Sequence, residues 1–258
     1  MTTAVAAPPA LAARGLTCRF GGLTAVDSVD FELRQCEVLG LIGPNGAGKT
    51  TLMNLISGLT SPTSGDVLLG ERRLTGLPPH TVTRLGVART FQVMRPFQGL
   101  TVRENVAIGA RFGSAGGPGN MRAALAKADD VLDWIGMAPL GRAEISRLTT
   151  GERKKLELAR ALAMDPTVLL LDEVMAGCNP REIGDVMELI RRVNARGVTI
   201  LLIEHLMKAV MGLCHRVLVL HHGKRIALGT PTEVAEDPAV VEAYLGQRYA
   251  ESRRKSNA

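Results

Sequence analysis

The stretch GPNGAGKT, residues 43 to 50, constrains the fold more than any other part of this chain. It follows EVLGLI (37–42), an apolar run typical of a buried strand, and precedes a helix expected from Lys49 until Gly58 ends it. Strand, glycine-rich loop and helix in this order form a P-loop, in which backbone N–H groups surround phosphate at a helix N-terminus. The chain is therefore expected to bind a nucleotide.

The chemistry of this loop assigns its side chains. Lys49 is expected to neutralise the β- and γ-phosphates, and the hydroxyl of Thr50 to reach Mg²⁺. The glycines permit backbone conformations that turn successive N–H groups inward. The expected nucleotide-binding set of the loop is Gly43, Pro44, Asn45, Gly46, Ala47, Gly48, Lys49, Thr50 and Thr51.

Other apolar runs predict an α/β fold with a mostly parallel sheet, because several alternate with helical patterns. Further strands are expected at 66–69, 86–91, 167–171, 198–203 and 216–220, and antiparallel strands at 16–20 and 28–33. Strand patterns stop between residues 92 and 163, where Thr101 and Glu104 form a candidate capping box and a helix is expected over 121–135. Trp134 is expected to pack in the core of this helical part.

These patterns predict one domain over residues 11–248. We expect an α/β core at 11–91 and 164–248, with a helical subdomain, 92–163, inserted between its two parts. Residues 1–10 are interpreted as a flexible lead-in, since Pro8 and Pro9 interrupt any apolar signal core. Residues 249–258 form a basic tail.

The stretch VLLLDE, residues 168 to 173, supplies the expected acidic groups. A carboxylate at the end of a buried parallel strand lies beside the phosphate loop and can hold Mg²⁺, usually through water, which is the role predicted for Asp172. The adjacent Glu173 can then orient or deprotonate an attacking water. The alternative is a pair of strand-end acids that only meet solvent.

The stretch RLTTGERKKLELARAL, residues 147 to 162, has two interpretations. Thr149 and Glu152 match a capping box that opens an amphipathic helix, whose residues 153–155 are expected on a solvated face. A second interpretation is that LTTGE is an altered phosphate-sensing signature. The residues of this stretch alone do not decide between them.

Composition narrows the classes of partner. The net charge is +6, but basic residues are dispersed and aromatic residues make up only 3%, which argues against nucleic acid. No apolar run approaches the roughly 18 residues that span a bilayer. The 4 cysteines show no paired spacing, which favours neither disulfides nor zinc and indicates a cytosolic compartment.

Taken together, the motifs resemble those of the ATP-binding subunits of ABC transporters. The resemblance covers residues from about 11 to 246 and rests on the order of its motifs: the P-loop, RTFQ with Gln92, LTTGE, VLLLDE, and LLIEHLM with His205. It implies the ABC ATPase fold, with ATP and Mg²⁺ as cofactors. It also implies a dimer of two identical or two different ATPases, in which each ATP lies between one subunit's P-loop and the other's signature.

The resemblance further implies roles for single residues. Phe20 would stack on adenine, Gln92 would touch Mg²⁺ or the lytic water, and His205 would contact the γ-phosphate. Residues 176–179 would form the D-loop, with Asn179 capping the next helix. The signature set would be Thr149, Thr150, Gly151 and Glu152, where the family usually has LSGGQ. A hydroxyl and the glycine next to the helix N-terminus are retained, although a threonine that caps its own helix is less free for phosphate.

The chain resembles most closely the subgroup that serves branched-chain amino-acid importers. The features that carry this resemblance are a residue bulkier than glycine at Thr150 and the segments FGGLTAVDSVDFEL, RTFQVMRPFQGLTVRENV, AGCNP and VVEAYLG. Val174 and Cys178 depart from the usual proline and leucine. The implied protein is an ATPase subunit on the inner face of the cell membrane that couples hydrolysis to uptake of such solutes. Transmembrane permeases would dock a short helix in a groove lined by Val93, Met94, Pro96 and Phe97, although any single one of these residues could instead pack within the helical subdomain. A separate solute-binding protein would act indirectly.

Two alternatives stay open at this point. One is a non-transport ABC ATPase acting on ribosomes or DNA, although such chains usually carry two cassettes or a long coiled coil. The other is a membrane-peripheral regulatory module that binds ATP without hydrolysing it, against which Glu173 and His205 argue.

Overall fold

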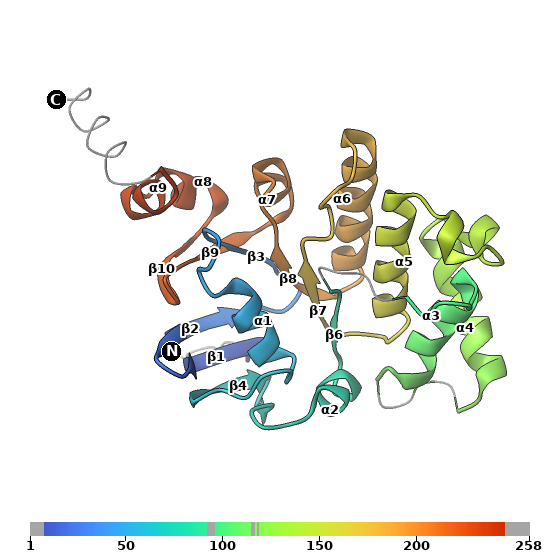
Figure 1. Ribbon diagram of the computed structural model, residues 1–258, viewed down its shortest axis with the longest axis horizontal. Helices are drawn as coiled ribbons and strands as arrows, with labels where there is room; N and C mark the ends of the chain where they lie inside the picture. Colours follow the sequence, from blue (N-terminus) through green and yellow to red (C-terminus); the bar gives the residue numbers. More distant parts are fainter. Residues whose placement is uncertain (1–7, 92–95, 115–116, 118, 246–258) are drawn as a thin grey trace, which may run out of the picture.

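The computed structural model describes residues 8–91, 96–114, 117 and 119–245. Two sheets and flanking helices form the molecule (Figure 1). The central sheet contains, in spatial order, β10 (Lys224–Gly229), β9 (Arg216–His221), β3 (Val38–Ile42), β8 (Thr199–Ile203), β7 (Val168–Asp172) and β6 (Val87–Arg89). Its strands are parallel except for β10, which pairs antiparallel with β9. The predicted α/β fold with a mostly parallel sheet is confirmed.

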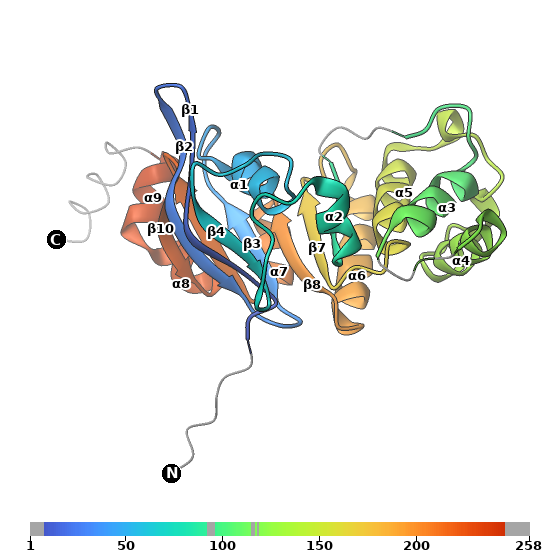
Figure 2. The same cartoon turned by 90° about the horizontal axis from the view of Figure 1, so that it is seen from below.

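The second sheet is antiparallel and comes almost entirely from the N-terminal part. Its strand order is β2 (Leu23–Leu33), β1 (Leu11–Phe20), β4 (Ser64–Leu69) and β5 (Arg72–Arg73). Figure 2 shows β1, β2 and β4 at one end of the molecule, next to α1 (Lys49–Ile56), while α3 (Val102–Phe112) and α4 (Met121–Trp134) lie at the other end. The predicted N-terminal antiparallel part is confirmed, and its first strand begins earlier than expected.

Alternation along the parallel strands explains why their sequences are apolar throughout. Leu39 and Leu41 of β3 face the core shared with α1 and the antiparallel sheet. Val38 and Ile42 of the same strand face the opposite core, shared with α6 (Pro180–Ala195) and α7 (Met207–Leu213). A strand covered on both faces shows no polar alternation.

Between β6 and β7 the described residues form helices. These are α3, α4, the 3₁₀ turns Ala138–Leu140 and Ile145–Arg147, and α5 (Thr150–Leu162). The predicted capping box of Thr101 and Glu104 opens α3. Trp134 packs against the core and is half buried. The Cζ atoms of Arg192 and Arg196 lie over its ring, 4.6 and 3.9 Å from the ring centre. The limits of the helical subdomain at residues 92 and 163 stay a prediction.

The remaining helices complete the layers. They are α2 (Pro79–Arg84), α8 (Pro231–Glu236) and α9 (Pro238–Leu245). In the part of the chain that the structure describes, no helix combines the length and the apolar character that crossing a bilayer requires. The expected lead-in and basic tail fall on residues that are largely or wholly outside the described ranges.

One strand ends earlier than predicted for a reason that concerns the site. The strand expected over 86–91 ends at Arg89. Thr90 N–H still donates to the carbonyl of Leu170 at 2.9 Å, but Phe91 N–H donates instead to the carboxylate of Glu157 on α5 at 2.8 Å. A side chain from the helical part therefore captures the chain where it leaves the sheet.

A buried ion pair joins the starts of two central strands. Glu37 precedes β3 and accepts from Arg216 of β9 at 2.6 and 3.0 Å, and its side chain is only 5% exposed. Burial would raise the pKa of Glu37, but hydrogen bonds from the Arg216 side chain and the Arg34 backbone outweigh it and lower the pKa. The charged carboxylate thus stabilises the folded state.

We expect Glu37→Gln to lower the free energy of unfolding at pH 7 by about 3 kcal/mol, because Arg216 would lose its buried counter-charge. Since the folded pKa is depressed, this contribution is complete above the unfolded pKa of about 4.3 and is lost as pH falls through the folded pKa. Urea unfolding at several pH values measures both effects. The exposed partner of Arg14, Glu32, offers a control: Glu32→Gln should cost under about 1 kcal/mol. A pH-independent difference would contradict the assignment to charge.

Candidate functional site

The phosphate loop joins β3 to α1 and needs glycine at two positions. Gly43 has φ 152° and Gly48 has φ 101°. A Cβ added at Gly43 would lie 2.1 Å from the carbonyl oxygen of Leu220, and one at Gly48 would lie 2.3 Å from that of Ala25. Both the backbone conformation and the close approach of neighbouring backbone therefore exclude other residues.

Lys49 opens α1 and is buried. Its Nζ donates to the carbonyl oxygens of Gly43 at 2.7 Å and Pro44 at 2.9 Å, so the loop curls around the ammonium. Burial lowers the pKa of Lys49, while the charges of Glu173 and Asp172 oppose that shift. The Lys49 ammonium and the N-terminus of α1 therefore lie near the carboxylates of Glu173 and Asp172.

A cleft of about 640 Å³ lies along the outer side of this loop. It brings together most of the residues predicted from sequence, from four separate parts of the chain. Those lining it are Phe20, Asn45, Gly46, Ala47, Gly48, Lys49, Thr50, Thr51, Glu173 and His205. Phe20 is 52% exposed, so its ring is available for stacking. A second cleft of about 570 Å³ includes Thr50 and Asp172, so the two clefts share Thr50.

Parallel register places the acidic groups. Asp172 is the last residue of β7 and pairs with Ile203 of β8, which in turn pairs with Leu41 of β3. The carboxyl ends of all three strands therefore meet at one edge, where Gly43, Glu173 and His205 follow them. In α/β proteins, ligands bind in the crevice outside the carboxyl ends of the parallel strands, which is this edge.

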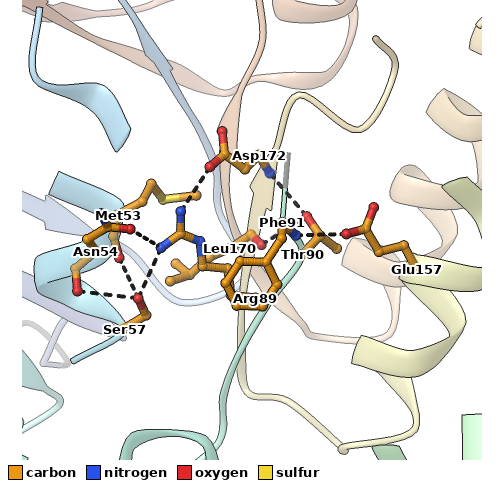
Figure 3. A network of polar contacts seen from close by, with 9 residues as sticks. All are labelled: Met53, Asn54, Ser57, Arg89, Thr90, Phe91, Glu157, Leu170 and Asp172. Carbon is orange, nitrogen blue, oxygen red and sulfur yellow. Dashed lines mark hydrogen bonds and ion pairs between the residues drawn. The ribbon is translucent and has the colours of Figure 1, made fainter. Parts of the chain in front are cut away.

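Asp172 is 2% exposed and held from two directions (Figure 3). Its Oδ2 accepts from Nη2 of Arg89 at 2.9 Å, and its backbone N–H donates to Oγ1 of Thr90 at 3.1 Å. Oxygen donors of a carboxylate and a hydroxyl are what Mg²⁺ prefers, so the chemistry of Asp172 and Thr50 fits this ion.

Glu173 follows in a left-handed conformation with φ 50°, which is uncommon for a residue with a side chain. Its N–H donates to the carbonyl of Ile203 at 3.0 Å, and its Oε1 lies 2.7 Å from Nε2 of His205. The strained turn aims the carboxylate into the 640 Å³ cleft beside the imidazole. A carboxylate–imidazole pair facing a phosphate cradle can hold and deprotonate water.

The turn at residues 149–152 forms the predicted capping box at the start of α5. Oγ1 of Thr149 accepts from Glu152 N–H at 3.2 Å, and Oε2 of Glu152 accepts from Thr149 N–H at 2.8 Å. Gly151 N–H donates to Oε1 of Glu182 on α6 at 3.2 Å. None of residues 149–152 lines the cleft at the P-loop of the same chain.

The Glu182 side chain lies against Gly151. A Cβ at Gly151 would lie 2.5 Å from Oε1 of Glu182, whose other oxygen accepts from Asn179 N–H at 2.9 Å. The same carboxylate thus joins the first turn of α5 to the start of α6. Asn179 caps α6, as predicted, with Pro180 as its first residue.

The solvated face predicted for residues 153–155 is wrong at Lys154. This side chain is buried, and its Nζ lies 3.5 Å from the carbonyl oxygen of Glu173. The reason is that α5 packs against α3 on one side and α6 on another, leaving little of its surface to solvent. Lys154 therefore links the helix of the LTTGE turn to the strained turn after β7.

Gln92, Val93 and Met94 lie outside the described residues. Of the same segment, Phe97 is described: it is 43% exposed and lies under the guanidinium of Arg160, 5.1 Å from the ring centre. Pro96 is half buried.

Sequence patterns did not single out several residues that the fold brings to this region. Arg89 and Glu157 line the 570 Å³ cleft, and His222, from the turn between β9 and β10, lines the 640 Å³ cleft. Glu182 lies behind the LTTGE turn. Arg89 is the first residue of the RTFQ segment, so its position near the predicted site residue Gln92 could have marked it as a candidate. His222 and Glu182 belong to none of the motifs that predicted the site.

Known proteins resemble this chain over nearly its whole length. Residues 26–176 match the family described as "ABC transporter", and residues 224–250 match "Branched-chain amino acid ATP-binding cassette transporter". The protein named "High-affinity branched-chain amino acid transport ATP-binding protein LivG" of Salmonella typhimurium is 44% identical, over 93% of this chain and 98% of that protein. BraF of Pseudomonas aeruginosa, with the same description, is 37% identical over the same shares.

Solved structures agree. A nucleotide-free ATP-binding cassette from an ABC transporter superposes with a TM-score of 0.83 at 29% identity, covering 92% of this chain and 99% of that one. The ADP conformation of the cassette MJ1267 gives 0.82 at 30% identity, covering 92% and 98%. The chain therefore belongs to the ABC transporter family, as one of its ATP-hydrolysing cassettes.

Proposed function

We propose that this chain hydrolyses ATP to drive the import of branched-chain amino acids or closely related solutes. The observation that carries the proposal is the meeting of Lys49, Glu173 and His205 at one 640 Å³ cleft. The solute is inferred from the relatives, whose names describe high-affinity branched-chain amino-acid transport, and from the match at residues 224–250.

The P-loop residues would bind the triphosphate, with Lys49 against the β- and γ-phosphates and Phe20 against adenine. The Lys49 ammonium already lies inside the loop, where it donates to the carbonyl oxygens of Gly43 and Pro44, so little reorganisation is needed to receive phosphate. Thr50 and Asp172, with Gln92, would hold Mg²⁺. When bound, this ion would offset charge that develops on the phosphate oxygens.

Glu173 would act as the general base. Its carboxylate is aimed by the strained turn and by His205, so a water at the γ-phosphate would lose its proton to Glu173 while the imidazole contacts the phosphate. His205 lies close enough to Glu173 to hold the carboxylate in one rotamer. The two side chains can pair because Glu173 and His205 follow neighbouring strands, β7 and β8.

The LTTGE turn would serve the ATP of a second subunit. It presents the N-terminus of α5 to the outside, away from the P-loop of its own chain. Two cassettes arranged head to tail would place residues Thr149, Thr150, Gly151 and Glu152 against the partner's γ-phosphate. The second subunit would be an identical or a related ATPase.

The assembly would lie on the inner face of the cell membrane. Transmembrane permease subunits would contact the region around Phe97, and a solute-binding protein would deliver the solute to them. Nucleic acid is not among the proposed partners.

Uptake measurements test the function directly. In proteoliposomes containing this chain, its permeases and the binding protein, we expect labelled leucine or isoleucine to accumulate only with internal ATP, with ATPase activity rising when solute is present. A dissimilar solute such as a sugar is the control. Hydrolysis in no state would favour the regulatory module, and co-purification with ribosomes or DNA instead of permeases would favour the non-transport ATPase.

Replacing the proposed base should separate binding from hydrolysis. We expect Glu173→Gln to keep ATP affinity within about threefold, while the hydrolysis rate falls by about 10² to 10⁴, because the amide cannot accept the proton. Single-turnover hydrolysis and calorimetry measure the two quantities. The exposed Glu188→Gln is a control that should change neither. Normal hydrolysis by Glu173→Gln would refute its assignment as base.

The two interpretations of the LTTGE turn can be separated at Thr149. Aspartate is a good helix cap but carries a negative charge, so Thr149→Asp should keep the free energy of unfolding within about 0.5 kcal/mol, whereas Thr149→Ala should lose about 1 kcal/mol. If the turn also meets phosphate, we expect Thr149→Asp to lower ATPase turnover of the assembled complex at least about tenfold through charge repulsion. Normal turnover of the aspartate variant would leave only the capping role.

A further inference from the structure

The Arg89 guanidinium lies between two elements of the proposed magnesium site (Figure 3). On one side its Nη1 donates to Oδ1 of Asn54 at 2.7 Å and to Oγ of Ser57 at 3.1 Å. On the other side its Nη2 donates to Oδ2 of Asp172 at 2.9 Å. The Arg89 side chain is 6% exposed, so these contacts are shielded from water.

These partners are placed so that Arg89 connects Thr50 to Asp172. Asn54 stands four residues after Thr50 on α1, and residues at this spacing lie on one face of a helix. Thr50 and Asn54 both line the 570 Å³ cleft, together with Arg89 and Asp172. A single guanidinium therefore bridges the face of α1 that carries Thr50 and the end of β7.

The geometry of the bridge is maintained at a cost. Nε of Arg89 is buried and has no hydrogen-bond partner within the described part of the chain. An unmade buried hydrogen bond is unfavourable, so the position of the guanidinium is determined by its contacts to α1 and Asp172. Thr90 adds to this, since its Oγ1 accepts from the backbone N–H of Asp172.

We propose that Arg89 is a positioning residue, which sets the separation between the Thr50 hydroxyl and the Asp172 carboxylate for divalent-metal binding. The inference rests on the proposed magnesium site. Arg89 is suited to this role because its planar fork reaches partners on two sides at once, whereas a lysine ammonium is a single point of charge. Groups that donate hydrogen bonds to a metal-binding carboxylate fix the orientation of that carboxylate in this way.

Two other roles would leave different signatures. If Arg89 only neutralised the buried Asp172, lysine could replace it without loss of metal affinity. If Arg89 instead competed with the metal for Asp172, removing it would tighten metal binding. Only the positioning role predicts weaker metal binding when the charge is kept and the bridge is broken.

The test measures Mn²⁺ binding to the full-length chain with ADP, by electron paramagnetic resonance. For Arg89→Lys we expect the Kd for Mn²⁺ to rise by about tenfold, while the affinity for metal-free ADP, measured with a chelator present, changes by less than about threefold. Arg216→Lys is a matched control, because it also replaces a largely shielded arginine that pairs with a buried carboxylate, and Arg216 lines neither cleft. It should leave Mn²⁺ affinity unchanged.

A second variant keeps the proposal testable if Arg89→Lys does not fold. Asn54→Ala removes the shorter of the two contacts that Arg89 makes with α1 and leaves the pair of Arg89 and Asp172 in place, so it should also weaken Mn²⁺ binding, by about three- to tenfold. The proposal is overturned if both variants bind Mn²⁺ as tightly as the wild type or more tightly, or if metal-free ADP affinity falls in parallel. Absence of Mn²⁺–ADP binding by the wild-type chain would instead refute the proposed magnesium site itself.

Discussion

Parallel pairing of β3, β7 and β8 is the constraint on which the rest of the molecule depends. It brings the carboxyl ends of three strands, far apart in sequence, to one edge, and the P-loop, the acidic pair and His205 each follow one of them. Because register in a parallel sheet is fixed by burial on both faces, a slip of one residue would turn Leu39 and Leu41 to the wrong core and move Asp172 away from the loop.

Charged side chains gather at this edge where little of them meets solvent, and several have fixed partners. Lys49 is enclosed by loop carbonyls, Asp172 is paired with Arg89, and Glu157 accepts the N–H of Phe91. Burial raises the pKa of Glu157, with the Phe91 hydrogen bond opposing that shift. Charged groups that already have fixed hydrogen-bond partners need little reorganisation when phosphate binds. Such preorganisation stabilises a transition state better than water does, because water must reorient.

The helix α5 connects functions that sequence motifs present as separate. Its first turn carries LTTGE, its third turn holds the exit of β6 through Glu157, and between them Lys154 reaches the carbonyl of Glu173. Glu182 then ties the same first turn to α6. A displacement of α5 would therefore act on the strand ends of its own cleft and on the start of α6.

Sequence patterns alone predicted the P-loop, the buried apolar strands, the capped starts of α3, α5 and α6, and the strand-end acids. These features are local: each depends on residues a few positions apart, whose spacing fixes a turn, a cap or a buried run. Tertiary structure alone decided that Lys154 is buried, that Gly151 meets Glu182, and that Arg89 holds Asp172 across 83 positions of sequence. Such contacts depend on which elements pack together and at what distance, and helical periodicity or β-alternation carries no information about either.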